Sequence, residues 1–580
     1  MGEEIEKRMQ GDGEIDGEKW VLDSSVDYKG RVPPRASTGV WKASLFVITL
    51  ALSERLSYFG IAPNLILYLT KVLRQDLKTA AKNVNYWSGV TTLMPLIGGI
   101  LADAYTGRFL MLLISSLIYL VGLTLLALSQ FVPSLKPCGT GICNKPRKIH
   151  EVVYFLALYC VSLGTGGQKP CFESLGADQF DSGHLQERKK KLSFFNWWNF
   201  AMACGLLLGV TVVVYVQDNV SFGVAYLILA TFLATAILTF FIGRPYYRYR
   251  IPEGSPFTSM LQVLVAALRK RKLRYPSSPA LLYEAPNPSG RFLGHTNSLR
   301  FLDKAAILEE KNLLPEQKQS SWRLATVTKV EELKLVLNMI PIWLTSLMFA
   351  VCEAQPSTFF VKQGATMNRK VTANFTVPAA SIYALAAIGT IISVAIYERI
   401  LVPFLRKVTG NQRGINIFKR VGIGFVFSII AIFVAALVER ERLRVAKKET
   451  IQLAESGHLS MSVFWLVPQY MLIGIADGFT LAGLQEFFYD QVPDSMRSLG
   501  LALFVSIFGA SKFLSNLLIT VADHVSTKAG KSWFGKDLNT SRLDNFYWLL
   551  VALSLLNLCA FAFFGRRYAY KNVQRQMTLV

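Results

Sequence analysis

The chain has 580 residues and a formal net charge of +23, with 52% hydrophobic and only 17% charged residues. A soluble protein of this length would divide into three or four domains, but their cores could not absorb apolar residues arranged in such long blocks. The composition therefore excludes a soluble protein and indicates one that crosses a membrane many times. Basic residues stand mainly between the apolar blocks, as in HLQERKKKL (184–192), which fits contact with anionic headgroups of a lipid bilayer. Because no recognition motif accompanies the charge, we exclude nucleic acid as a partner.

Twelve apolar stretches are long enough to form membrane-spanning helices, since a span needs about 20 residues. The first six are expected at 42–70, 84–104, 107–131, 150–172, 194–216 and 222–243. The second six are expected at 334–360, 377–398, 416–438, 461–485, 497–521 and 545–565.

Six spans, a polar gap and six more spans make up the pattern of the major facilitator fold, an all-α membrane fold of two six-helix bundles. Within the gap, PFTSMLQVLVAALRKRK (256–272) reads as an amphipathic helix with a basic end, lying on the membrane surface. We therefore predict an N-terminal tail, a first bundle, a central loop, a second bundle and a C-terminal tail at 1–41, 42–243, 244–333, 334–566 and 567–580.

An even number of spans places both termini on one side of the membrane. The basic central loop favours the cytoplasm for the loop and both tails, whereas Lys and Arg in the short loops are about evenly divided between the faces. On the opposite face, Asn374-Phe375-Thr376 forms a glycosylation sequon. Cys138 and Cys143, in KPCGTGICNKP, either form a disulfide there or are two free thiols.

Six ionisable residues fall inside the predicted spans of both halves. An ionised side chain at membrane depth is costly and nearly always faces the bundle interior or a wet cavity, where it binds, relays protons or pairs. One alone would fit a side chain snorkelling near a helix end, but several from both halves predict a polar central cavity. The six residues are Glu54, Arg55, Lys169, Glu353, Asp477 and Glu486.

The motif GGILADAYTGRF (98–109) ends the second span. Its glycines allow helices to approach closely, and Asp103 with Arg108 can lock a short turn between two spans. The motif resembles the signature loop of major facilitators. A helix cap followed by a basic loop residue is the alternative interpretation.

Features typical of enzymes do not stand out in the sequence. GTGG (164–167) lies inside an apolar span, with no strand before it and no GK[ST] after it, so we expect helix packing and not nucleotide binding. Asp178 and Asp181 indicate a helix end in preference to metal ligands, and the five histidines are scattered. Since no Ser-His-Asp or Cys-His arrangement is present, we expect no catalytic residues, no metal and no cofactor.

The chain resembles the proton-dependent oligopeptide transporter family, and specifically its plant nitrate/peptide branch. The resemblance covers nearly the whole chain. It rests on the segments SERLSYFGIAPNL, NYWSGVTTLMPLIGGILADAYTGRF, GTGGQKPCFESLGADQFD, SFFNWWNF, YERILVPFLRKVTGN and LVPQYMLIGIADGFTLAGLQEFFYDQVPDSMRSLG.

The family carries the motif E-x-x-E-R in its first span, where it is associated with proton coupling. This chain has Glu54 and Arg55, but Ala51 stands in place of the first glutamate. Arg55 is always charged, so protonation of Glu54 leaves it without a counter-charge and readier to attract an anion. The resemblance implies Glu54 as the proton site and Arg55 as its electrostatic partner; weak or absent coupling is the alternative that Ala51 raises.

The resemblance also implies which residues meet the substrate. Lys169 and Glu486 match the family's fourth-span lysine and tenth-span acid, and a pair between the two halves would close one face of the cavity. Tyr58 resembles a substrate-contacting tyrosine, but Ala62 stands where peptide-transporting members often carry a basic residue. Glu353 aligns with a histidine of some nitrate-carrying members, and it either meets a substrate amine or pairs internally. We expect the binding and gating residues to be Tyr58, Lys169, Glu353, Gln355 and Glu486.

These features predict a secondary transporter that moves a small polar solute, anionic or zwitterionic, through a central cavity with protons as the coupling ion. Nitrate, a small peptide and an amino-acid-like plant metabolite are the candidate substrates. A solute-sensing transceptor or an uncoupled facilitator is the alternative, and a membrane enzyme would need a catalytic constellation. Plant members of the family divide between the plasma membrane and the vacuolar membrane, and we expect one of these two locations.

Overall fold

The computed structural model describes residues 19–575 with short gaps, and these residues are predominantly helical. Cys138 and Cys143, which form either a disulfide or two free thiols, and the sequon residue Asn374 lie outside the described residues. The positions left out are 1–18, 22, 24, 138–146, 182, 251–255, 276–281, 285–290, 294, 309–319, 321, 373–374, 410–414, 450–457, 493–496, 531, 536, 569–572 and 576–580.

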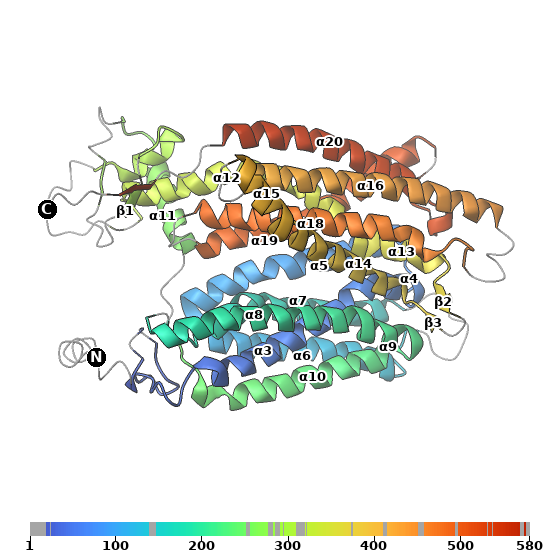
Figure 1. The fold of residues 1–580 in the computed structure, drawn as a ribbon, viewed down its shortest axis with the longest axis horizontal. Helices are drawn as coiled ribbons and strands as arrows, with labels where there is room; N and C mark the ends of the chain where they lie inside the picture. The colour runs from blue at the N-terminus through green and yellow to red at the C-terminus, as the bar shows by residue number, and fades with distance from the viewer. Residues whose placement is uncertain are drawn as a thin grey trace.

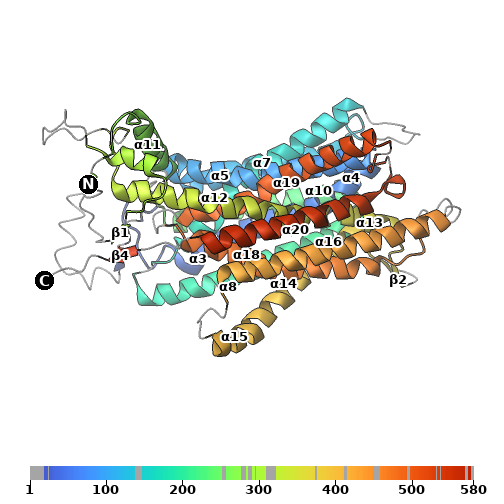
Figure 2. The same cartoon turned by 90° about the horizontal axis from the view of Figure 1, so that it is seen from above.

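The long helices form two bundles that lie side by side, one from each half of the chain (Figures 1 and 2). The first bundle contains α3 (Val40–Ile61), α4 (Leu65–Lys71), α5 (Leu77–Leu101), α6 (Arg108–Phe131), α7 (Lys148–Ala177), α8 (Leu185–Leu208), α9 (Val214–Asn219) and α10 (Phe222–Ile242). The second contains α12 (Val327–Glu353), α13 (Val361–Thr366), α14 (Ala384–Ile396), α15 (Val402–Thr409), α16 (Ile417–Lys448), α18 (Val467–Asp490), α19 (Arg497–Lys528) and α20 (Leu543–Arg567).

Packing within each half is extensive, and one helix from each half joins the two. In the first bundle α7 packs against α5 and α6, and α3 packs against α8 and α10. In the second, α18 packs against α14 and α16, and α20 packs against α12 and α16. The largest contact between the bundles is made by α5 with α19. This arrangement confirms the all-α, two-bundle fold expected from the hydropathy pattern.

Within the described residues, eleven helices are long and apolar enough to cross a membrane. The predicted second span is the exception, and it corresponds to α5. This helix has 25 residues, enough for about 37 Å at 1.5 Å per residue, but its first third is polar because it carries Lys78, Lys82, Asn83 and Asn85. The helix begins at Leu77, seven residues before the predicted start of the span. The prediction was late because hydropathy alone does not detect the polar first turns of the helix.

The two ends of the bundles carry different short elements (Figure 1). At one end, called the α11 end, lie α11 (Pro256–Arg269) and the antiparallel pair of β1 (Arg291–Leu293) with β4 (Val573–Arg575). This pair joins the central loop to the C-terminal segment. At the opposite end, called the hairpin end, the strands β2 (Lys370–Thr372) and β3 (Phe375–Thr376) pair.

The predicted amphipathic helix of the central loop is present as α11, but much of its apolar surface faces protein. Met260, Val263 and Ala266 are buried in a cluster with residues of α12 and of the short helix η6 (Arg300–Ala306). Leu261 and Leu268 remain exposed on its other side. The helix is therefore docked on the start of the second bundle, and contact of its exposed side with a membrane surface stays a prediction.

Close helix packing explains the glycine cluster in the fourth span. A Cβ added at Gly98 of α5 would overlap the carbonyl oxygen of Gly166 in α7, so the two backbones touch where both residues lack a side chain. Gly164 and Gly167 in the same way face α6. The helix-packing interpretation of GTGG is therefore confirmed.

Candidate functional site

The first span presents a buried acid and a half-buried base, each with an unpaired polar atom. Ser53 and Ser57 of α3 donate their hydroxyl hydrogens to backbone carbonyls one turn back, at 2.8 Å each. Glu54 is only 3% exposed, and its Oε1 atom has no hydrogen-bond partner among the described residues. The Nε atom of Arg55 is likewise buried and unpaired there, and its guanidinium lies 4.8 Å from the ring centre of Phe59. The unpaired carboxylate oxygen of Glu54 can therefore take up a proton, and the unpaired N–H of Arg55 can donate to an anion.

Lys169 extends from α7 toward the same part of α3. Its Nζ atom lies 4.5 Å from the ring centre of Tyr58, a cation–π contact. Tyr58 is itself held by stacking on Trp87, with ring centres 5.8 Å apart. Glu54 and Arg55 are the charged groups near enough to act on the Lys169 ammonium. The first bundle thus brings two bases and one acid together.

The second bundle contributes a complementary group of charges. Glu353 ends α12, just before the π-helical turn η8 (Pro356–Phe360), and its Oε2 atom lies 3.5 Å from Nζ of Lys512 on α19. Asp477 on α18 has a buried Oδ1 atom without a hydrogen bond in the described part of the chain. Glu353 and Lys512 are the charged groups that act on it. Here two acids meet one base.

Lys512 was missed in the sequence, although the rule that identified the other six residues applies to it. It lies at the centre of the predicted eleventh span, in GASKFLSN, and it is only 6% exposed. Its small and hydroxylated neighbours made that stretch look less apolar, so that the lysine did not stand out.

Two tyrosines lie between the groups of the two bundles. The Tyr58 hydroxyl lies within electrostatic reach of Glu54 and Arg55 on its own helix and of Glu353 across the interface. Tyr383 lies within reach of Glu353, Asp477 and Tyr58. We call the assembled group the central polar cluster. Its members are Glu54, Arg55, Tyr58, Lys169, Glu353, Tyr383, Asp477 and Lys512.

Gln355 and Glu486 occupy different positions relative to this cluster. Gln355 is 1% exposed; its Nε2 donates to the Val351 carbonyl at 2.8 Å, and its Oε1 accepts no hydrogen bond from the described residues. Glu486 is partly exposed near the α11 end of α18, four residues before that helix ends at Asp490. The pair of Glu486 with Lys169 stays a prediction.

The turn between α5 and α6 contains the predicted pair and additional arginine contacts. Asp103 and Arg108 lie 3.4 Å apart, and Arg108 also contacts Asp178, which in turn accepts from Arg250 at 3.1 Å. Gly107 connects the helices with a φ of +73°, a conformation that glycine adopts without strain. The ion pair between Asp103 and Arg108 is thus present, within a larger group at the α11 end.

Asp181 belongs to a neighbouring set of ion pairs. Arg35 binds Asp181 at 2.9 Å and Glu187 at 2.7 Å, and Arg248 binds Glu187 at 2.7 Å. Burial opposes the charge of Arg35, yet its hydrogen bonds to both carboxylates leave the pKa of the guanidinium above its ordinary value. Asp178 and Asp181 therefore serve as partners of arginines at the helix end.

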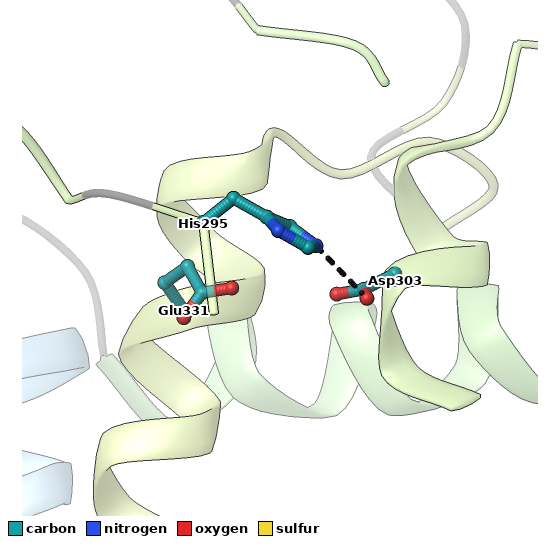
Figure 3. A group of neighbouring side chains, drawn as sticks. All are labelled: His295, Asp303 and Glu331. Carbon is teal, nitrogen blue, oxygen red and sulfur yellow. Dashed lines mark hydrogen bonds and ion pairs between the residues drawn. The ribbon is translucent and has the colours of Figure 1, made fainter. Parts of the chain in front are cut away.

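One group of side chains has the composition of a metal site. The ligand atoms of His295, Asp303 and Glu331 lie within 4.8 Å of one another, and Figure 3 shows His295 directed at Asp303. The ammonium of Lys334 already contacts both carboxylates, at 2.6 Å and 2.8 Å. Because an internal cation holds the acids, the group fits a structural link between the central loop and α12 better than a metal site.

Several polar contacts join the two bundles near the hairpin end. Lys78 pairs with Asp523 at 2.7 Å, and Asn85 donates to Asn516 at 3.0 Å. Further contacts are Lys362 Nζ to Thr70 Oγ1 at 2.9 Å, Ser381 Oγ to the Val210 carbonyl at 2.7 Å, and Arg369 to Asp218 at 3.9 Å. These contacts hold the bundles together at that end.

Two bundles of helices long and apolar enough to cross a membrane, with acidic and basic side chains brought together between them, define an all-α membrane protein of the major facilitator type. Residues 109–534 match the model of PTR2, the POT family. The chain belongs to this family, which is a family of transporters.

Relatives support the assignment over nearly the full length. The chain is 56% identical to Protein NRT1/ PTR FAMILY 5.6 of Arabidopsis thaliana over 563 residues, covering 96% of each chain. The crystal structure of the POT family transporter PepTSo is similar in fold, with a TM-score of 0.67 at 18% identity over 91% of this chain and 98% of that one. A POT family transporter in complex with 5-aminolevulinic acid gives a TM-score of 0.59 at 12% identity, over 91% and 96% of the two chains.

Proposed function

We propose that this transporter moves a small zwitterionic or anionic solute through the central polar cluster, coupled to protons, across the plasma membrane or the vacuolar membrane. The observation that carries the proposal is the charge distribution of the cluster. The first bundle supplies Glu54 with two bases, a formal net charge of +1, and the second supplies Lys512 with two acids, a formal net charge of −1. A solute with a carboxylate and an amine matches both sides.

Each half has a distinct role in this mechanism. Arg55 and Lys169 bind the carboxylate of the solute, and Glu353 with Asp477 faces its amine. Protonation of Glu54 removes the only acid of the first group, so its net charge rises from +1 to +2 and its attraction for the carboxylate increases. Uptake of a proton and of the anionic group are thereby coupled.

The contacts at the hairpin end support alternating access. With the bundles joined there, solute exchange takes place from the α11 end, which we assign to the cytoplasm. Tilting the bundles would break the pair of Lys78 with Asp523. It would also bring Lys169 and Glu486, from opposite bundles, toward a pair that closes the α11 end.

A zwitterionic solute fits the central polar cluster better than nitrate does. Nitrate has no group for Glu353 and Asp477 to bind, and two acids repel it unless they are protonated. The similar fold solved with 5-aminolevulinic acid, a molecule with one amine and one carboxylate, is consistent with this choice.

Uptake of labelled solutes tests the proposal. We expect oocytes expressing the protein to take up 5-aminolevulinic acid or dialanine faster than nitrate. Lys169→Gln should reduce that uptake at least about tenfold, because one charge-assisted contact is lost. Lys189→Gln, at an exposed position of α8, is the matched control and should leave uptake unchanged. Equal uptake by both variants would contradict the role of Lys169.

Ala51 favours a second function, that of a sensor or an uncoupled facilitator. It is buried in α3 one turn before Glu54, and its methyl group cannot take up a proton. Binding and flux measured on the same purified protein distinguish the functions: a sensor binds the solute without moving it, and a facilitator moves it without pH dependence.

A further inference from the structure

A cavity of about 250 Å³ lies at the hairpin end, and none of its lining residues belongs to the central polar cluster. Its walls come from both bundles. The first bundle contributes α4, α9 and the start of α10, and the second contributes the segment around the β2–β3 hairpin. The lining residues used here are Leu67, Lys71, Asp218, Phe222, Arg369 and Pro378.

Two cations and one acid line this cavity. Within the described residues, the Lys71 ammonium makes no hydrogen bond or ion pair, although Asp218 and Arg369 are near enough to act on it. Arg369 donates from Nη1 to the Val377 carbonyl at 3.1 Å, and the same atom forms an ion pair with Asp218 Oδ2 at 3.9 Å, a distance too long for a hydrogen bond. The cations therefore exceed the acid by one and retain free donors.

The remaining wall of the cavity is partly apolar. Leu67, Val72 and Phe222 from the first bundle and Pro378 from the second provide its apolar part, and Gln217, Asn219 and Thr376 add uncharged polar groups. Surface cavities that bind small molecules combine such an apolar wall with a few polar groups that fix orientation. An inorganic anion would use only the cations, whereas a carboxylate on a short apolar or aromatic body would use both surfaces.

We propose that this cavity is a second binding site, specific for a small apolar carboxylate, which stabilises the arrangement closed at the hairpin end. The ligand carboxylate bridges Lys71 of the first bundle and Arg369 of the second, two like charges that otherwise repel each other across the interface. Opening the hairpin end would separate them and destroy the site. Binding at this site does not depend on the transport mechanism. We also expect the bound carboxylate to inhibit transport, and that expectation rests on the proposed alternating access.

Binding of benzoate to the purified full-length protein tests the site. We expect benzoate to raise the melting temperature of the wild type, and its neutral amide, benzamide, to have no such effect. Arg369→Gln and Lys71→Gln should each weaken benzoate binding at least about tenfold. Lys370→Gln, the exposed next residue, at the start of β2, is the charge-matched control and should bind as the wild type does. Equal affinities for Arg369→Gln and Lys370→Gln, or equal effects of benzamide and benzoate, would overturn the proposal.

A transport measurement separates this site from the central one. Benzoate added on the hairpin side should inhibit solute uptake by the wild type but not by Arg369→Gln, without competing with the solute. Competitive inhibition that persists in Arg369→Gln would mean that benzoate acts at the central polar cluster, which overturns the second site and leaves the proposed transport intact. Thermal stabilisation lost in Arg369→Gln supports the site even if the protein transports nothing.

Discussion

At the residue scale, the central polar cluster balances three acids against three bases contributed by five helices. The sequence identified five of these six charges, because ionised residues inside apolar spans are conspicuous. It could not identify their partners: Lys512 and Glu353 are 159 positions apart and meet only when α12 and α19 pack. The sequence did not show whether Glu353 has an internal partner, and in the structure Nζ of Lys512 lies 3.5 Å from its carboxylate.

The pair of Glu353 with Lys512 predicts a specific pattern of stability. Lys512→Gln leaves Glu353 and Asp477 as neighbouring acids without a base, so the melting temperature of the purified protein should fall. The double variant Lys512→Gln/Glu353→Gln removes one acid as well and should recover most of that loss. A double variant that is less stable than Lys512→Gln alone would show that the two side chains do not interact.

At the element scale, α5 is the helix whose features hydropathy predicted least well. Its polar first third contacts α19 of the other bundle, and its glycine-rich second half packs on α7. The first feature follows from its place at the interface, where polar side chains meet polar partners instead of lipid, and the second from its close approach to α7 within the first bundle. The motif containing Asp103 and Arg108 was recognisable in sequence, whereas its contacts with Asp178 and Arg250 depend on segments far along the chain.

The close approach of α5 and α7 predicts a cost for the smallest possible substitution. Gly98→Ala places a methyl group on the carbonyl of Gly166 and should destabilise the protein by about 1–3 kcal/mol, the usual range for overpacking. Gly422→Ala is the matched control, because its Cβ would meet no atom closer than 4.0 Å. Equal melting temperatures of the two variants would mean that the helices separate easily at Gly98.

At the scale of the whole molecule, two bundles joined at the hairpin end imply a second arrangement in which they part there. The apolar pattern predicted the bundles themselves, since the spans of each half are contiguous in sequence. The contacts that select one arrangement over the other could not be predicted, because they join surface residues such as Lys78 and Asp523 whose pairing hydropathy does not encode.

Asp523→Asn should shift the population toward the arrangement open at the hairpin end. A cysteine introduced at Ser515, which lies against Asn85 in the interface, should then react faster with a membrane-impermeant maleimide. Glu441→Gln breaks an ion pair with Arg444 inside one bundle and serves as the control, with no expected change in rate. The charge exchange Lys78→Asp/Asp523→Lys should restore slow labelling of the introduced cysteine. If this cysteine reacts no faster in Asp523→Asn than in Glu441→Gln, the ion pair does not hold the bundles together.

The most direct test of the mechanism is transport by Glu54→Gln in proteoliposomes. With an inward proton gradient, the wild type should accumulate its zwitterionic solute above equilibrium. Glu54→Gln should still exchange labelled for unlabelled solute across the membrane but should lose accumulation driven by the gradient, because the variant has no proton site beside Arg55 and Lys169. Accumulation by Glu54→Gln equal to that of the wild type would contradict proton coupling through this residue.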